Sequence, residues 1–445
     1  MSSRQRGLSR RAFLARVTGA AAAGGALVSA ASGAPRKRPS RGEQTSVAAS
    51  EKLGIGFLGF GRRGYELGSA ISRMPRVRCV LACDVDTRRT AYAMKYLAKH
   101  QPGLKTCKDF REVLSNREVD AVVIAAPDHW HAVLAIEAAK AGKDVFCESP
   151  ISLTVREARA MSAAVGRYGR IFQAGTFRRS MAACHEACEL VRSGKIGQVR
   201  SVHVLAGPPS QPCSLSGQAV PAYLDWNLWL GPAPEAAYHP YRCMGGGSSR
   251  YGWRAWRDYS GGSMTHYGSH YFDLVQWALG ADKSGPVEII PPDGKEHKKL
   301  TYRYANGVTV YNDKGPKGAA VEFTGTEGVV GIGGSVSSRL GYQTWPEGLA
   351  PPSKERSRSR RSSRSASEYY ALRDHLKNFL DCIETRQSPV GDVEAACRSV
   401  TVCHLGNIAY WLRRPLKWDP VKEEIVGDPE ASRWLGRPKR APWRL

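Results

Sequence analysis

The residues whose types and spacing point most clearly to a ligand-binding site are three glycines near the start of the predicted fold. Gly59, Gly61 and Gly64 form a Gly-x-Gly-x-x-Gly pattern directly after an apolar run and before a helical one. In such a turn the first glycine permits a tight bend, the second lets the backbone approach a pyrophosphate, and the third lets the helix pack closely on the strand. The helix N-terminus then supplies amide donors for phosphates, so the pattern predicts a dinucleotide site.

An acidic residue stands at the distance that this turn requires. Asp84 follows Gly64 by twenty residues, at the end of the next apolar run. A carboxylate there accepts both ribose hydroxyls and repels a 2′-phosphate, so we predict NAD rather than NADP as the cofactor. Arg88 and Arg89 qualify this prediction because they can meet such a phosphate.

Histidines are the candidates for acid–base chemistry. His270 is the best candidate base, because an ordinary histidine pKa of about 6.5 suits removal of a hydroxyl proton at neutral pH. His266 and His270 are four residues apart on a helix predicted over 264–280, a spacing that can also bind zinc, with His129 and His131 as further ligands. The alternative is a polar wall of a substrate pocket, and we predict no metal.

Alternating strands and helices must position the glycine turn. Strands are predicted at 53–58, 77–83, 119–126, 144–147 and 171–175, with helices between them at 64–74, 109–114, 131–141 and 155–168. Residues 51–176 are therefore predicted to form an α/β, doubly wound Rossmann domain with a parallel sheet.

The pattern changes after about Arg178. Strands are predicted at 199–206, 287–290, 300–304, 308–312, 320–324 and 329–332, with hairpin turns at 306–307 and 325–328 and long helices at 367–385 and 393–412. Residues 177–445 are therefore predicted to form a C-terminal α+β domain with a mainly antiparallel open sheet.

Several short segments, taken with the glycine turn, carry a family resemblance. They are Ala126-Pro127-Asp128-His129-Trp130-His131, Cys147-Glu148-Ser149-Pro150, the run from Asp225 to Pro232, Trp253-Arg254 with Gly261-Gly262, and the run from His266 to His270 with Asp273. With them the chain resembles the Gfo/Idh/MocA oxidoreductase family from Leu53 to Leu445. The resemblance implies a sugar or polyol substrate bound over the nicotinamide between two domains, and a C-terminal sheet that often forms homo-oligomers.

The chain departs from this family at two catalytic positions. Members usually carry Glu-Lys-Pro after the fifth strand, where Ser149 replaces the lysine, and Asp-x-x-x-His in the second domain, where His266 replaces the aspartate. Serine supplies no cation and its hydroxyl is a poor acid or base unless activated, and His266 lacks a fixed negative charge. The resemblance thus places Ser149, His266 and His270 at the catalytic site, with His270 retained.

The resemblance also implies the residues that bind the cofactor and the substrate. The predicted cofactor-binding residues are Gly59, Gly61, Arg62, Arg63, Gly64, Asp84, Pro127, His131 and Glu148, and the predicted substrate-binding residues are Arg179, Arg254 and Trp226. Salt bridges are the alternative for the two arginines of the second set, and a buried aromatic core is the alternative for the tryptophan.

The N-terminus predicts export rather than fold. Ser9-Arg10-Arg11-Ala12-Phe13-Leu14 is a twin-arginine signature, and an apolar run from Val17 to Ala31 follows it. Residues 1–34 are predicted to be a signal peptide read by the twin-arginine machinery, and residues 35–50 a disordered linker, so the location is periplasmic or extracytoplasmic. Because this route carries folded proteins, we expect a tightly held cofactor.

Composition restricts the partners further. The net charge of +25 includes a Ser/Arg-rich run at 353–367, which we interpret as a solvated loop because no nucleic-acid motif accompanies it. No apolar stretch outside the N-terminus is long enough for a membrane span. The eleven scattered cysteines contain no C-x-x-C pair and specify no disulfide.

Three functions remain open on the sequence. The first is an exported NAD-dependent oxidoreductase that acts on a sugar or polyol by hydride transfer. The second is a redox-neutral glycoside-cleaving enzyme with a self-recycling NAD. The third is an NAD-binding, sugar-binding protein whose catalysis is impaired by the residues at positions 149 and 266.

Overall fold

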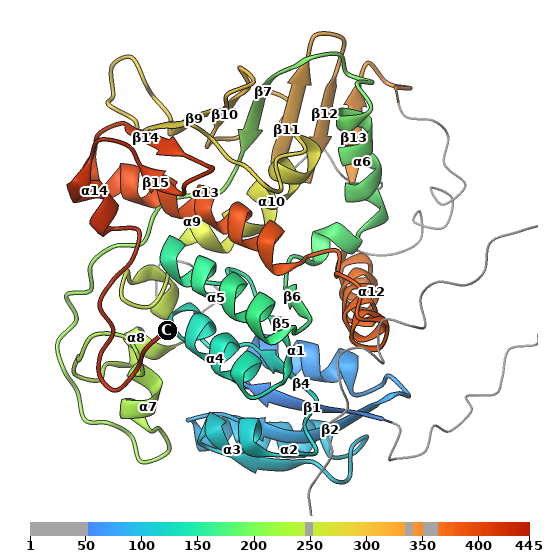
Figure 1. Ribbon diagram of the computed structural model, residues 1–445, viewed down its shortest axis with the longest axis vertical. Coiled ribbons are helices and arrows are strands. Elements are labelled where there is room, and N and C mark those ends of the chain that lie inside the picture. Colours follow the sequence, from blue (N-terminus) through green and yellow to red (C-terminus); the bar gives the residue numbers. More distant parts are fainter. Residues whose placement is uncertain (1–51, 245–251, 334–340, 350–363) are drawn as a thin grey trace, which may run out of the picture. The chain divides into compact units, whose positions relative to one another are not determined.

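A computed structural model of the chain describes residues 52–244, 252–333, 341–349 and 364–445 (Figure 1). The predicted signal peptide and linker, and residues 353–363 of the predicted Ser/Arg loop, lie outside these described residues. The last residues of that predicted loop, 364–367, instead form the first turn of a long helix.

The N-terminal sheet is parallel throughout and confirms the predicted Rossmann architecture. Its strand order is β3-β2-β1-β4-β5-β6, in which the order reverses at the β1–β4 pair. Ligands bind at the carboxyl ends of the strands at such a reversal. The strands are β1 (Leu53–Leu58), β2 (Val77–Cys83), β3 (Lys105–Cys107), β4 (Ala121–Ile124), β5 (Asp144–Cys147) and β6 (Phe172–Ala174).

Helices begin where short polar side chains satisfy free backbone amides. Asp86, Asp109 and Thr154 each accept a hydrogen bond from an amide in the first turn of the helix that follows. The helices are α1 (Arg62–Ile71), α2 (Thr87–Leu97), α3 (Phe110–Ser115), α4 (Asp128–Lys140) and α5 (Val155–Tyr168). Neither α2 nor β3 was predicted from the sequence. The helix α4 begins three residues earlier than predicted, so His129 and His131 lie in its first turn.

The second sheet is mixed and mostly antiparallel, as predicted. Its order is β13-β12-β11-β7-β10-β9-β8-β14-β15, and β7 with β10 form its parallel pair. The predicted strands are β7 (Val199–Val204), β8 (Glu288–Ile290), β9 (Thr301–Arg303), β10 (Thr309–Tyr311), β11 (Val321–Gly325) and β12 (Val329–Ile332). Three further strands were not predicted from the sequence: β13 (Tyr342–Trp345), β14 (Leu416–Asp419) and β15 (Glu424–Ile425).

The helix predicted across residues 264–280 is two helices, so that prediction was wrong. A short α9 (Ser263–His266) ends at Tyr267, and α10 (Gly268–Ala278) begins there. The remaining helical elements are η3 (Phe177–Ser180), α6 (Ala182–Arg192), α7 (Trp226–Leu230), α8 (Pro240–Cys243), η4 (Trp253–Ala255), α12 (Arg364–Thr385), α13 (Val393–Leu412) and α14 (Pro429–Arg433).

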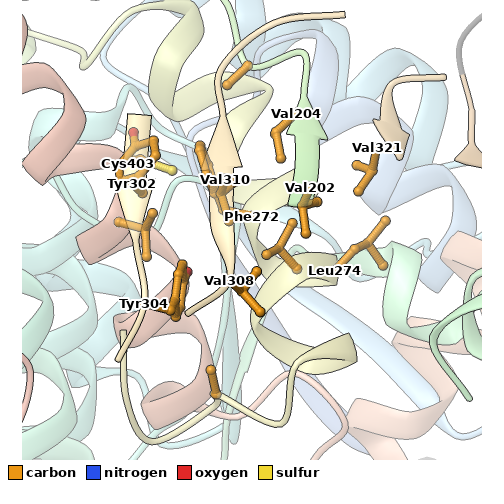
Figure 2. Close-up of a cluster of buried hydrophobic side chains, with 14 of the residues drawn as sticks. Val202, Val204, Phe272, Leu274, Tyr302, Tyr304, Val308, Val310, Val321 and Cys403 are labelled. Atoms are coloured by element: carbon orange, nitrogen blue, oxygen red, sulfur yellow. The ribbon is translucent and has the colours of Figure 1, made fainter. Parts of the chain in front are cut away.

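One face of the second sheet covers the largest apolar core. Figure 2 shows Val202 of β7 and Val310 of β10 facing Phe272 and Leu274 of α10, with Cys403 of α13 beside Tyr302 of β9. The helix α13 packs against α10 and also against α5 of the Rossmann domain (Figure 1). This packing holds α10, and with it His270, against the carboxyl end of the parallel sheet.

All eleven cysteines lie in the described residues and are free thiols. Among the described residues, no helix is both long and apolar enough to cross a membrane.

Candidate functional site

The glycine turn lies at the carboxyl end of β1. At two of its three positions the surrounding backbone leaves no room for a side chain. Gly59 has a φ of +90°, and a Cβ there would lie 2.6 Å from the backbone nitrogen of Ala126. A Cβ on Gly64 would lie 2.4 Å from the carbonyl oxygen of Gly59. A Cβ on Gly61 would meet a flexible neighbour, Arg89 Nη1, at 2.6 Å. Positions 59 and 64 therefore admit no side chain without moving backbone.

A cavity of about 290 Å³ opens beside this turn. Gly59, Asp84 and Pro127 line it, as the sequence predicted for a cofactor site. The Asp84 carboxylate accepts hydrogen bonds from the backbone amides of Phe60 at 2.7 Å and Asp86 at 2.9 Å. Burial raises the pKa of Asp84, and the opposing charge of Arg89 limits that rise. Each carboxylate oxygen keeps a free acceptor position, so this cavity fits the adenosine half of a dinucleotide.

The opposite wall of the cavity comes from the second half of the chain, and sequence reasoning missed it. Tyr223, Trp229 and Tyr238 line this wall. Arg88 joins the two halves, since its guanidinium lies 3.5 Å from the centre of the Tyr223 ring and pairs with Asp86 at 2.7 Å. The signal that could have identified this wall is the density of aromatic residues between 223 and 259.

The two arginines of the turn have different surroundings. Arg62 is exposed and pairs with Glu66 at 3.1 Å, so its guanidinium stands at the N-terminus of α1. Arg63 pairs with Glu148 at 2.8 Å and with Glu66 at 3.0 Å. Arg63 and Glu148 thus tie α1 to the loop after β5 and place the next residue, Ser149, at the same sheet edge as the glycine turn.

The structure brings two of the predicted catalytic residues into contact. The Ser149 hydroxyl lies 3.0 Å from Nε2 of His270, although 121 positions separate them in sequence. Phe177 packs edge-on against the imidazole at 5.6 Å between ring centres. Within the described part of the chain, Nδ1 of His270 has no hydrogen-bond partner. A serine hydroxyl held against an imidazole nitrogen is the arrangement that activates serine in proton transfer.

The pKa of His270 differs from the ordinary value assumed from sequence. Burial, and then the positive charges of Arg178 and Arg63, hold that pKa well below 6.5. His270 is therefore uncharged at neutral pH and able to accept a proton, but its protonated form is disfavoured where it stands.

The third predicted catalytic residue has a different partner. Nε of Arg254 donates a hydrogen bond to Nε2 of His266. Burial lowers the pKa of His266 to about 3, and the charge of Arg254 adds to that effect. His266, at the position where the resemblance implies a carboxylate, is therefore an uncharged imidazole that accepts a hydrogen bond from the Arg254 guanidinium.

A buried acid near this pair was not singled out from the sequence. Asp128, the first residue of α4, is 1% exposed, and both its carboxyl oxygens have no hydrogen-bond partner among the described residues. Burial raises its pKa to about 6, while the charges of His131 and Arg254 oppose that rise. A group with this pKa changes charge close to neutral pH.

Three predicted site residues have structural surroundings instead. Arg179 is buried and pairs with Asp273 at 2.8 Å and Asp282 at 2.7 Å. Trp226 stacks on Trp229 at 4.8 Å and its indole nitrogen donates to a backbone carbonyl. Both ring nitrogens of His131 lie 2.7 Å from backbone carbonyl oxygens. The geometry does not support direct binding by these three side chains: they hold loops together around the site.

The zinc alternative has no geometric support in the residues that the structure describes. No group of three or more His, Cys, Asp and Glu side chains there could hold a metal ion. Nε2 of His266 and Nε2 of His270 both already have hydrogen-bond partners in the protein.

Comparisons with known proteins agree with this arrangement. Residues 53–176 match the model described as oxidoreductase family, NAD-binding Rossmann fold. Residues 210–332 and 356–445 match the model described as oxidoreductase family, C-terminal alpha/beta domain.

Individual relatives cover only part of the chain. An uncharacterized oxidoreductase from Streptococcus pneumoniae is 27% identical over 51% of this chain and 50% of its own length. A glycosyl hydrolase family 109 protein from Parabacteroides distasonis is 30% identical over 43% of this chain and 42% of its own length. The chain thus spans about half the length of the curated relatives it matches, or less.

Solved structures share the fold over most of the chain. The WlbA dehydrogenase from Bordetella pertussis, in complex with NADH and UDP-GlcNAcA, has a TM-score of 0.60 at 17% identity and covers 83% of this chain and 98% of its own. The scyllo-inositol dehydrogenase from Lactobacillus casei, with NAD(H) and scyllo-inositol, has a TM-score of 0.55 at 16% identity and covers 82% of this chain and 99% of its own. At these identities the likeness shows the fold.

Proposed function

Because the chain belongs to the Gfo/Idh/MocA oxidoreductase family, we propose that it is an NAD-dependent oxidoreductase that acts on a hydroxyl group of a sugar or polyol. The contact between Ser149 and His270 is the observation that carries this proposal. It supplies a hydroxyl and a proton acceptor at the sheet edge where the glycine turn lies. The solved relatives include an inositol dehydrogenase, which supports a polyhydroxylated substrate.

The chain's own residues fit a bound NAD. Asp84 would accept hydrogen bonds from the adenosine ribose hydroxyls, the amides at the start of α1 would hold the pyrophosphate, and Arg62 would add a positive charge there. Bound NAD would supply the acceptor for a hydride from the substrate carbon. The carboxylate of Asp84 favours NAD over NADP, because a 2′-phosphate would place two negative charges together.

Ser149 and His270 would then move the proton of the substrate hydroxyl. In the tautomer whose Nε2 carries no proton, His270 accepts a hydrogen bond from the Ser149 hydroxyl, and that hydroxyl keeps lone pairs that can accept the substrate O–H. As the substrate proton passes to Ser149 Oγ, the serine proton passes to Nε2. Serine thus replaces the family lysine as a relay, and the final acceptor is His270.

The lowered pKa of His270 predicts the pH dependence of this step. Since the uncharged imidazole is the accepting form, kcat/KM should show no loss centred near pH 6.5 when pH falls from about 9 to about 5. Any step near pH 6 should belong to Asp128, whose pKa burial raises to about 6. Profiles for the wild type and for Asp128→Asn separate the two groups. A step near pH 6.5 that persists in Asp128→Asn would show that His270 titrates normally.

The proposed function is tested on purified full-length protein. Mass spectrometry of the small molecule released on unfolding should identify NAD, whereas NADP would contradict the assignment to Asp84. The cofactor-loaded protein should then change its nicotinamide absorbance with members of a panel of sugars and inositols. Bound NAD with no turnover of any panel member or glycoside would favour the sugar-binding protein without catalysis, and Ser149→Lys with His266→Asp should then restore activity.

A redox-neutral glycoside-cleaving enzyme is the second candidate, and the similarity to glycosyl hydrolase family 109 proteins favours it. Such an enzyme oxidises a sugar carbon transiently and returns the hydride, so it needs no external cofactor. Cofactor-loaded protein should release the aglycone from aryl glycosides without added NAD. If no aglycone appears while free sugars are oxidised, the first function holds and this one fails.

We also propose export by the twin-arginine pathway and self-association, on the N-terminal signature and the family resemblance respectively. A reporter fused to residues 1–50 should leave the cytoplasm, and replacing Arg10 and Arg11 by lysines should retain it. Light scattering of the purified protein should give a mass of at least two chains. A monomer would contradict the second proposal.

A further inference from the structure

We propose that Arg254 binds a carboxylate on the substrate, so that the enzyme acts on a carboxylate-bearing sugar in preference to its neutral counterpart. This inference rests on the proposed oxidoreductase function and specifies its substrate class. It is carried by the position of the Arg254 guanidinium, by the absence of a direct ion pair to it among the described residues, and by the loss of two charged groups that the family usually has at this site.

The position of Arg254 is fixed by its neighbours. Its guanidinium lies 4.5 Å from the centre of the Trp253 ring, and its Nε donates to His266. His266 precedes His270, the partner of Ser149, by four residues across the break between α9 and α10. The charges of Asp128 and, more weakly, of Glu148, the residue before Ser149, act on Arg254. The guanidinium is therefore tied, through His266, to the segment that carries His270, the group that would receive the substrate proton.

The Arg254 guanidinium forms no ion pair with an acid that the structure describes, although the charge of the buried Asp128 acts on it from a longer distance. No described carboxylate lies within 4.0 Å of its nitrogens, in contrast to Arg63, which pairs with both Glu148 and Glu66. Its hydrogen-bond acceptor, His266, is an uncharged ring. The two terminal nitrogens of Arg254 have no acceptor among the described residues, and they form a planar fork suited to a carboxylate.

Arg178 adds to this excess of positive charge. It lies over the Tyr271 ring at 5.2 Å and, among the described residues, is in no ion pair. Its charge is also felt by His270. With Ser149 in place of a lysine and His266 in place of an aspartate, the site holds two guanidinium groups that are in no ion pair among the described residues, and the charges of Asp128 and Glu148 act on Arg254 from beyond ion-pair distance.

Two other anions must be distinguished from a substrate carboxylate. The first is the cofactor pyrophosphate, but the start of α1 and Arg62 already stand where the glycine turn directs it. The second is a sugar phosphate. The Arg254 guanidinium carries one positive charge and has its two terminal nitrogens free. It therefore matches the single negative charge of a carboxylate better than the double charge of a phosphate dianion.

The test compares matched sugars in wild type, Arg254→Gln and Arg254→Lys. The substrates are D-glucose with D-glucuronate, D-galactose with D-galacturonate, and D-glucose 6-phosphate, each supplied to NAD-loaded protein. Arg192→Gln is the control, because this arginine is exposed on α6 and pairs with Glu189. Turnover gives kcat and KM, calorimetry gives sugar affinity, and tryptophan fluorescence gives NAD affinity.

We expect wild type to prefer at least one acid to its neutral partner by about 10- to 100-fold in kcat/KM, the range of one charge-assisted bidentate contact. Arg254→Gln should remove that preference mainly through KM, Arg254→Lys should keep part of it, and NAD affinity should not change. The control should behave as wild type.

The other outcomes separate this inference from the proposed function. Turnover of neutral sugars with no preference for acids overturns the inference and leaves the function standing. Calorimetric binding of an acid that needs Arg254, without turnover, supports the inference and contradicts the function. Equal losses for acidic and neutral sugars in Arg254→Gln, weakened NAD binding, or a preference for the phosphate would each overturn the assignment to a substrate carboxylate.

Discussion

His270→Ala is expected to lower kcat by about 100- to 10,000-fold, the usual contribution of a positioned proton acceptor. The imidazole Nε2 lies 3.0 Å from the Ser149 hydroxyl, and without it that hydroxyl has no acceptor for its proton. Substrate affinity should change much less than kcat, because the lost interaction acts on the transferred proton rather than on the bound sugar.

The control for this variant is His185→Ala, which removes an exposed histidine of α6 that contacts Trp277. Steady-state kinetics, thermal melting and NAD titration should be measured on both proteins. A His270→Ala protein with normal melting and NAD affinity but lost turnover supports the proton relay. Normal turnover in that variant would remove His270 from the mechanism, and Ser149 with it.

Arg179→Met should lower the free energy of unfolding by about 3–5 kcal/mol, as expected when one partner of a buried ion pair is removed. Asp273 is 1% exposed and would keep a hydrogen bond from Ser399 but lose the guanidinium that neutralises it. The variant should therefore show a lower urea midpoint, with substrate KM unchanged under conditions where it remains folded.

The matched control is Arg303→Met, which breaks a solvent-exposed pair with Glu288 on the second sheet. Such pairs contribute about 0–1 kcal/mol, so its midpoint should hardly move. Unchanged stability of Arg179→Met together with a raised KM would instead restore the substrate-binding role that the sequence suggested for Arg179.

Local sequence patterns were sufficient to predict the glycine turn, its acidic partner and the two fold types of this protein. The turn from Gly59 to Gly64 could be recognised because its conformation and close approaches admit little else, and the acid at Asp84 follows from the length of one β-α-β unit. The two fold types followed from whether helices separate consecutive strands. Short strands such as β3 and β15 escaped because two or three residues give no periodicity.

The residue types at positions 149, 266 and 270 were readable from the chain, and so was the departure from the family at the first two. Only the tertiary structure decided what those residues touch. Ser149 meets His270, and His266 meets Arg254, only once the folded chain brings these separate segments together. Whether an arginine binds substrate or a buried acid also depends on partners distant in sequence, as the pairing of Arg179 with Asp273 shows. Burial and neighbouring charges, which set the pKa of His270, arise only when those distant segments pack together.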